Sequence, residues 1–344
     1  MEGELEIRWQ ARLEALCSQL RTAVRGRIEK SLASDGLAEL ARPLRAGAGD
    51  VTFGIDQCAE DALDRWLTDT ARHENISLLS EDTGWRHRGP GGGGVRELPD
   101  FDHGGPRIAI DPIDGTRHLM SDMRSAWSIV SFAPPGAREP RMADLTLGLV
   151  SEIPDSRAAR WRSLSAIQGR GGMFHERALD SQALFTERRL GTGSDQRADQ
   201  GYFAFFRYHP AQRPALAAIE ARFFERLAHF EAADVRACYD DQYISSGGQL
   251  ALVSLGVYRM CADLRAFLGA RHPEIPSVPT HPYDLAGAVL VAREAGAVVE
   301  AIGGESLDFP IDATTPVSFV AWTNAATRQR LSPHFRSALG SCPA

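Results

Sequence analysis

Residues 108–116, Ile-Ala-Ile-Asp-Pro-Ile-Asp-Gly-Thr, join a short apolar run to two carboxylates. The apolar run predicts a buried strand that ends at Asp111, because the proline that follows has no N–H to continue a ladder. Asp111 and Asp114, three residues apart across a stiff turn, can converge on a hard cation, which prefers oxygen ligands. Gly115 allows close backbone approach, and Thr116 could cap a helix whose free N–H groups would suit a phosphate. Asp-Pro and Asp-Gly also occur in turns without chemistry, so the stretch alone leaves phosphoryl transfer and a plain loop both open.

Two other segments repeat this arrangement of an apolar element with an acid at its end. Residues 75–82 predict a short strand that ends at Glu81, which could equally be a solvated loop residue. Residues 283–296 predict a small-residue helix that begins at Asp284, where an N-cap role would also explain the acid. Asp56 stands where an acidic helical pattern begins, and it has the same structural alternative.

The composition excludes several classes of protein. A chain of 344 residues predicts about two domains. The net charge of −7 argues against binding to a nucleic-acid polymer or an anionic membrane, which would need a positively charged surface. Five cysteines without paired spacing argue against a disulfide framework or a structural zinc site. The acidic N-terminus does not resemble a secretory signal, and no apolar run is long enough to span a membrane, so we expect a cytoplasmic protein.

Hydrophobic periodicity divides the chain into two parts. In residues 1–195, amphipathic helices over about 4–30 and 59–67 precede successive strands, which predicts an α+β domain with two helices on an antiparallel sheet. Residues 88–94 are glycine-rich and predict a mobile loop that lacks the ending of a nucleotide-binding P-loop. In residues 196–344, strands alternate with helices, which predicts an α/β domain that carries the last acid and part of the substrate pocket.

The three acidic motifs together resemble those of one family. The hexapeptide at 111–116, the Glu-Asp pair at 81–82 and the Asp-Leu-Ala-Gly to Glu-Ala-Gly segment from Asp284 are similar, in order and type, to the signatures of the inositol monophosphatase superfamily. These are lithium-sensitive, Mg²⁺-dependent phosphatases, among them inositol monophosphatases and archaeal-type fructose-1,6-bisphosphatases. The resemblance covers residues 50–331 and implies the layered αβαβα sandwich of the sugar phosphatases.

The resemblance also implies roles for individual residues. Two Mg²⁺ ions would be held by Glu81, Asp111, the carbonyl of Ile113, Asp114 and Asp284. As catalytic groups, Thr116 and Glu81 would orient the attacking water, and Asp56 is similar to an outer carboxylate that accompanies a weaker third ion. The substrate would be bound by Asp114, Gly115, Thr116 and Ser246.

The chain departs from the family at the substrate side. Ser277 stands about where animal inositol monophosphatases carry a glutamate for inositol hydroxyls, which weakens inositol specificity. Arg117, His118, Arg207 and Arg265 are candidate contacts for a second phosphate, although each also has a structural reading.

We therefore predict a Mg²⁺-dependent phosphomonoesterase that acts on a small sugar or cyclitol phosphate, with fructose-1,6-bisphosphatase or inositol monophosphatase activity. Two alternatives stay open: a nucleotide 3′-phosphatase of the phosphoadenosine phosphate type, and a non-catalytic relative that binds metal and ligand. The resemblance further implies a homodimer.

Overall fold

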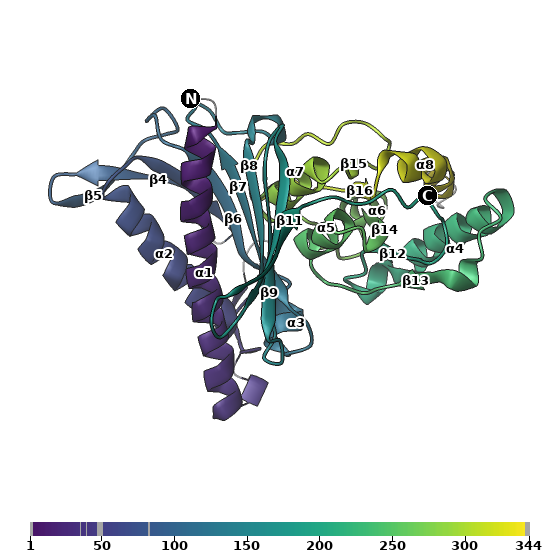
Figure 1. Ribbon diagram of the computed structural model, residues 1–344, viewed down its shortest axis with the longest axis horizontal. Helices are drawn as coiled ribbons and strands as arrows, with labels where there is room; N and C mark the ends of the chain where they lie inside the picture. The colour runs from purple at the N-terminus through teal and green to yellow at the C-terminus, as the bar shows by residue number, and fades with distance from the viewer. Residues whose placement is uncertain (1–2, 35, 39, 47–50, 82, 341–344) are drawn as a thin grey trace.

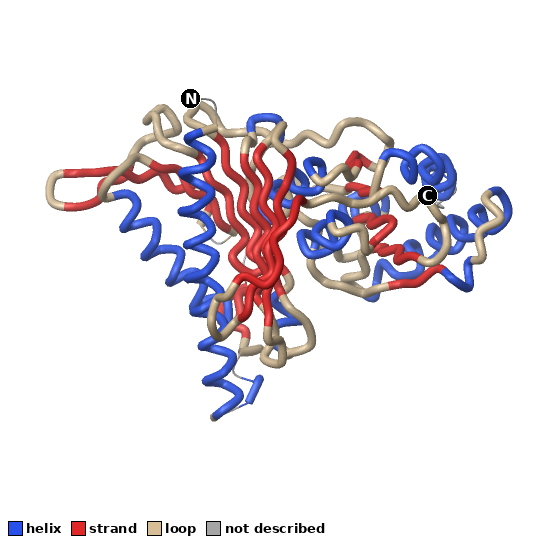
Figure 2. The backbone as a smooth tube through the Cα atoms, viewed as in Figure 1, coloured by secondary structure: helices blue, strands red, loops and turns tan. Residues whose placement is uncertain are grey.

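The computed structural model describes residues 3–34, 36–38, 40–46, 51–81 and 83–340, which form alternating layers of helices and sheets (Figures 1 and 2). The α-helices are α1 (Glu4–Ala33), α2 (Gly54–Ala71), α3 (Thr116–Met120), α4 (Arg213–Phe230), α5 (Ser246–Ser254), α6 (Arg265–Arg271), α7 (Ala286–Glu294) and α8 (Ala325–Gly340). The strands of the first half are β1 (Pro43–Ala46), β2 (Val51–Phe53), β3 (Ile76–Ser80), β4 (Gly84–Gly91), β5 (Gly94–Glu97), β6 (Arg107–Asp114), β7 (Ala126–Ala133), β8 (Leu147–Ile153), β9 (Arg160–Ile167), β10 (Gly171–Ala178) and β11 (Leu184–Arg189). Those of the second half are β12 (Gly201–Phe205), β13 (Cys238–Asp240), β14 (Tyr258–Asp263), β15 (Val298–Ala301) and β16 (Phe319–Trp322).

The larger sheet has the strand order β11-β10-β9-β8-β7-β6-β3-β4-β5. Its neighbouring strands are antiparallel except for β3 and β6, which pair in parallel, so the predicted antiparallel sheet is in fact mixed. The exception arises because the chain leaves β3 for the outer strands β4 and β5 and then returns to the other side of β3. This crossover puts the ends of β3 and β6 at the same edge of the sheet.

The glycine-rich segment is not the loop that its composition predicts. Residues 84–97 form the hairpin β4–β5, which projects from the body of the molecule (Figure 1). A two-residue Gly92-Gly93 connection closes it, as hairpin turns of this length favour residues with positive φ. Strand β4 pairs with β3 only as far as Arg88, and Pro90 pairs with Val95 of β5 alone. The missing N–H of Pro90 therefore interrupts no hydrogen bonds between β4 and β3.

Helices α1 and α2 cover one face of the larger sheet, as the sequence predicts (Figure 1). Leu13, Leu20 and Ile28 of α1 are buried against this face, whereas Ile7 near its start is exposed. Each buried aliphatic side chain contributes about 1.5–3 kcal/mol of burial free energy.

Helices α5 and α7 lie on the opposite face, between the larger sheet and a second sheet. The second sheet has the order β13-β12-β14-β16-β15, with β12 parallel to both of its neighbours and the other pairs antiparallel. Helices α4 and α8 pack on its outer face around a third core. These layers confirm the predicted αβαβα architecture. The division into domains at residue 195 stays a prediction, although the first sheet ends at Arg189 and the second begins at Gly201.

None of the helices in the described ranges combines the length and apolar character that crossing a membrane requires. The four described cysteines, Cys17, Cys58, Cys238 and Cys261, are free, and Cys342 lies outside the described residues.

Candidate active site

Strand β6 carries the two acids of the opening motif to one end of the larger sheet. The strand does not stop at Asp111 as predicted but continues past Pro112 to Asp114, with an irregular register against β7 between the two acids. The backbone N–H of Ile113 donates to Oδ1 of Asp111 at 2.8 Å. The local turn therefore fixes the orientation of this carboxylate.

Residues 115 and 116 make a sharp corner after the strand. Gly115 has φ 102° and precedes α3, a left-handed conformation that favours glycine. Thr116 is the first residue of α3 and not its side-chain cap. Its hydroxyl lies 2.8 Å from the carbonyl oxygen of Ile113 and 3.0 Å from Oδ1 of Asp56, and it can donate to either. The corner thus links Thr116 to an acid 60 residues away.

Asp56 is not the N-cap of α2 but lies in its first turn. Its Oδ2 accepts a hydrogen bond of 2.7 Å from the backbone N–H of Phe53, which satisfies a donor at the helix end. One carboxylate therefore has a structural contact and a contact with Thr116 at the same time.

Asp114 points at the N-terminus of α5. Its Oδ2 accepts hydrogen bonds of 2.7 Å from the hydroxyl of Ser245 and from the backbone N–H of Gly247. A Cβ at residue 247 would lie 2.3 Å from Ile129 and 3.0 Å from this oxygen, so only glycine permits the approach. A carboxylate at a helix N-terminus is stabilised by hydrogen bonds from free backbone N–H groups and by the positive end of the helix dipole.

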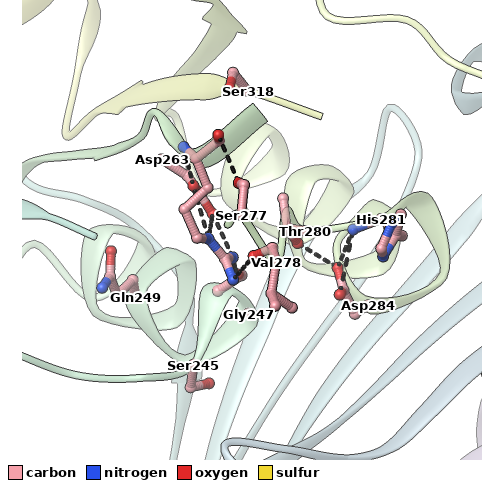
Figure 3. Close-up of polar contacts among 12 residues, drawn as sticks. Ser245, Gly247, Gln249, Asp263, Ser277, Val278, Thr280, His281, Asp284 and Ser318 are labelled. Atoms are coloured by element: carbon pink, nitrogen blue, oxygen red, sulfur yellow. Dashed lines mark hydrogen bonds and ion pairs between the residues drawn. The ribbon is translucent and has the colours of Figure 1, made fainter. Parts of the chain in front are cut away.

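Asp284 lies in a 3₁₀ turn, Pro282–Asp284, just before α7, so it is not the N-cap of that helix. The hydroxyl of Thr280 and the backbone N–H of His281 donate to its carboxylate (Figure 3). Glu81 follows β3 directly and is exposed. The second acid of its motif, Asp82, lies outside the described residues.

The four predicted metal acids line a single pocket at this edge of the sheet. Burial, followed by the charges of Asp114, Glu81 and Asp284, raises the pKa of Asp111 well above its usual range. Burial also raises the pKa of Asp114 to about 6, against the hydrogen bonds it accepts, and that of Asp284 well above normal. Carboxylates held this close repel one another, and a divalent cation would relieve the repulsion.

The acids do not form a closed metal cluster, however. Among the described residues, no three His, Cys, Asp or Glu side chains are gathered as a ready-made metal site. The donor set fits Mg²⁺ in chemistry, since it consists of carboxylates with a backbone carbonyl at Ile113.

The pocket is also lined by aromatic and basic residues. Besides the acids and residues 113, 115 and 116, its lining consists of Arg117, Phe206, Tyr208, Ile244, Ser246, Arg265, Val278, Pro279, His281 and Tyr283. The guanidinium of Arg117 lies 4.8 Å from the centre of the Tyr208 ring, and that of Arg265 lies 3.9 Å from the centre of the Phe206 ring. The sequence did not indicate the two aromatic residues, because they follow β12 without any motif of their own.

Arg265 is buried, and each nitrogen of its guanidinium has a hydrogen-bond partner. Its guanidinium forms an ion pair of 2.6 Å with Asp263 and donates to the carbonyl of Val278 and to the hydroxyl of Ser246. The predicted substrate residue Ser246 is therefore in the pocket, but its hydroxyl already accepts a hydrogen bond. The hydroxyl of Ser277 donates to the backbone carbonyl of Arg265.

Two of the other candidate cations do not reach this pocket. Arg207 forms ion pairs with Glu220 and Asp240. His118 is buried, and its ring stacks on that of Tyr243. Both residues have structural contacts, and His118 is not the solvated first-turn residue that was the alternative for it.

The fold is shared with solved structures, several of which are described as inositol monophosphatases. No protein-family model matches the sequence, and no curated protein matches it significantly. An inositol monophosphatase from Thermotoga maritima matches with a TM-score of 0.58 at 17% identity, over 97% of this chain and 100% of the other. An extragenic suppressor protein from Bartonella henselae matches with a TM-score of 0.61 at 15% identity, over 94% and 98%. A protein described as an inositol monophosphatase and fructose 1,6-bisphosphatase matches with a TM-score of 0.57 at 15% identity, over 93% and 98%.

Proposed function

We propose that this chain, which has the fold of the inositol monophosphatases, is a Mg²⁺-dependent phosphomonoesterase that acts on a small phosphorylated sugar or cyclitol. The observation that carries the proposal is the convergence of Glu81, Asp111, Asp114 and Asp284 on one pocket. These acids come from three distant segments, and a divalent cation bound among them would offset their mutual repulsion. The names of the similar structures add support for the same class of reaction.

Glu81, Asp111, Asp114 and Asp284, with the carbonyl of Ile113, are the residues that would hold Mg²⁺. When bound, Mg²⁺ would activate a water molecule and polarise the phosphoryl group. The charges of Asp114, Glu81 and Asp284 all act on the carboxylate of Asp111, which suits Asp111 to a shared position in the site.

The other residues of the corner would position the reactants. Because the hydroxyl of Thr116 can donate to Asp56, its lone pairs are left to accept a hydrogen bond from the attacking water. Asp56 would then hold the hydroxyl in the orientation that accepts. The backbone N–H groups of Gly115 and Thr116 are the proposed donors to the phosphate.

The substrate side favours a sugar bisphosphate over an inositol monophosphate. At residue 277, where a carboxylate would hold inositol hydroxyls, the chain has a serine whose hydroxyl is directed at the backbone of Arg265. The rim instead carries the guanidinium of Arg117, which suits a second anionic group. A nucleotide 3′-phosphatase remains the second candidate, because Phe206 and Tyr208 could contact a base.

A substrate panel tests the proposal. With Mg²⁺, the purified protein is expected to release phosphate from fructose 1,6-bisphosphate faster than from inositol 1-phosphate or phosphoadenosine phosphate. Fastest release from phosphoadenosine phosphate would favour the nucleotide phosphatase. If none of the substrates releases phosphate but calorimetry detects binding, the chain is a non-catalytic relative and the proposed activity is wrong.

A homodimer remains a prediction of the resemblance, and a cytoplasmic location remains a prediction from the sequence.

A further inference from the structure

A second cavity, of about 190 Å³, lies between α1 and strands β8, β9 and β10, on the face of the larger sheet that α1 covers. It shares no lining residue with the candidate active site. The pairing register explains how its wall is built. Ser151, Ser163 and His175 stand in one cross-strand row, and Trp161 stands directly opposite Arg177 in the next. Directly paired residues of antiparallel strands project on the same face, so these side chains all meet the helix.

The floor of the cavity holds a buried guanidinium. Arg21 of α1 is 3% exposed, and it stacks on Trp161 with 3.4 Å between its Cζ atom and the ring centre. Nη1 donates to the hydroxyl of Ser151 at 3.0 Å and approaches the carbonyl oxygen of Glu152 at 3.5 Å. Within the described residues, neither Nε nor Nη2 has a hydrogen bond, and no carboxylate forms an ion pair with Arg21.

A buried guanidinium that forms no direct ion pair is costly, because the charge has lost water without a carboxylate in contact. The pKa of Arg21 is lowered to about 10, chiefly by burial; the groups of Cys17 and Glu152 act against this shift, and the charge of Arg177 acts with it. Two positive side chains therefore face one space, and an anion placed between them would stabilise both. A guanidinium binds phosphate and carboxylate through paired hydrogen bonds, which the unused nitrogens of Arg21 can supply.

The remaining wall residues fit a small oxyanion. The hydroxyl of Ser163 is a further donor on the floor, and Ser18 contributes another from α1. Glu14 is the one acid among the lining residues, and its carboxylate already accepts a hydrogen bond from Gln10. His175 at the rim is 3.5 Å from Glu187. With two arginines against one glutamate, the described lining is net positive in a chain whose total charge is −7.

We infer that this cavity binds a small oxyanion, a phosphate or a carboxylate, between Arg21 and Arg177. The inference is independent of the proposed phosphatase activity. The anion would join α1 to the β8–β10 part of the sheet, and removing it would leave Arg21 without a counter-charge.

Isothermal titration calorimetry in EDTA tests the inference, with phosphate, sulfate and acetate as probes at constant ionic strength in sodium chloride. EDTA removes any metal that could bind an anion in the candidate active site, and the Arg177→Gln variant assigns the remaining binding to the second cavity. We expect saturable binding of at least one oxyanion by the wild-type protein. Phosphate and sulfate without acetate would identify a tetrahedral anion, and acetate alone would identify a carboxylate.

Arg177→Gln is the decisive variant, because Arg177 is half-buried at the rim and its loss leaves the core intact. We expect it to weaken binding by about tenfold or more, the value of a hydrogen bond to a charged group. Arg21→Gln should weaken binding further, provided that circular dichroism shows a native fold. Arg162→Gln is the matched control, since Arg162 is the exposed neighbour of Trp161 on the other face of β9 and should leave affinity unchanged. Absence of saturable binding by the wild-type protein, or equal affinity in Arg177→Gln, overturns the inference.

Discussion

Asp111→Asn is expected to reduce Mg²⁺-dependent phosphate release by more than 100-fold and to raise the melting temperature of the metal-free protein. The first effect follows because Asp111 is the proposed shared ligand. Mutating even a residue that only hydrogen-bonds to a metal ligand typically lowers metal affinity or activity by about 10- to 100-fold. The second effect follows because the negative charges of Asp114, Glu81 and Asp284 repel the carboxylate of Asp111. An asparagine at residue 111 removes this repulsion. Steady-state phosphate release in Mg²⁺ and thermal unfolding in EDTA measure the two effects.

The matched control for this variant is Asp69→Asn. Asp69 is an exposed carboxylate on α2 whose partner is Arg72, so its loss changes the charge by the same amount far from the pocket. We expect Asp69→Asn to change the rate of phosphate release by less than about twofold and the melting temperature by less than about 1 °C, as surface substitutions usually do. Full activity in Asp111→Asn would show that this carboxylate takes no part in catalysis.

Mg²⁺ is expected to stabilise the protein more strongly as the pH rises from 5 to 7. The native pKa values of Asp111, Asp114 and Asp284 are raised above their usual range, so the metal-free native state binds more protons than the unfolded chain. Its free energy of unfolding therefore falls as pH rises through the window from about 4, the usual Asp value, to about 6, the pKa of Asp114, and beyond. Mg²⁺ replaces these protons, and a ligand at 100 times its dissociation constant contributes about 2.7 kcal/mol.

Urea unfolding with Mg²⁺ and with EDTA, at pH 5, 6 and 7, measures this difference directly. The difference between the two conditions cancels the titration of groups outside the pocket. It should be small at pH 5, larger at pH 7 and strongly reduced in Asp111→Asn. A stabilisation that is equal at all three pH values would mean that Mg²⁺ binds away from these acids.

The sequence predicted the parts of the site that depend on local chemistry. The run into Asp111 and Asp114 indicated a buried strand with acids at its end, because β-branched residues followed by Asp-Pro leave few alternatives. The small residues after Asp284 indicated a closely packed helix, and α7 is buried along its length. The helical spacing of apolar residues in 4–30 predicted α1, because this spacing gives a helix one apolar face that can pack on a sheet.

The parts that were missed depend on contacts between distant segments. The parallel pair β3–β6 and the hairpin in the glycine-rich run are set by which strands become neighbours, and this is not a property of either segment. The contact between Thr116 and Asp56 and the ion pair of Arg265 with Asp263 likewise required the folded chain. The stack of Arg21 on Trp161 joins residues in α1 and β9 that share no sequence pattern.

The most direct test of the central claim is a Mg²⁺ titration of metal-stripped protein while phosphate release from fructose 1,6-bisphosphate and inositol 1-phosphate is followed. The account predicts no release in EDTA and a saturable rise in rate with Mg²⁺, which Asp111→Asn abolishes and Asp69→Asn preserves. Release that is equally fast in EDTA, or that is absent from both substrates at every Mg²⁺ concentration, would contradict it.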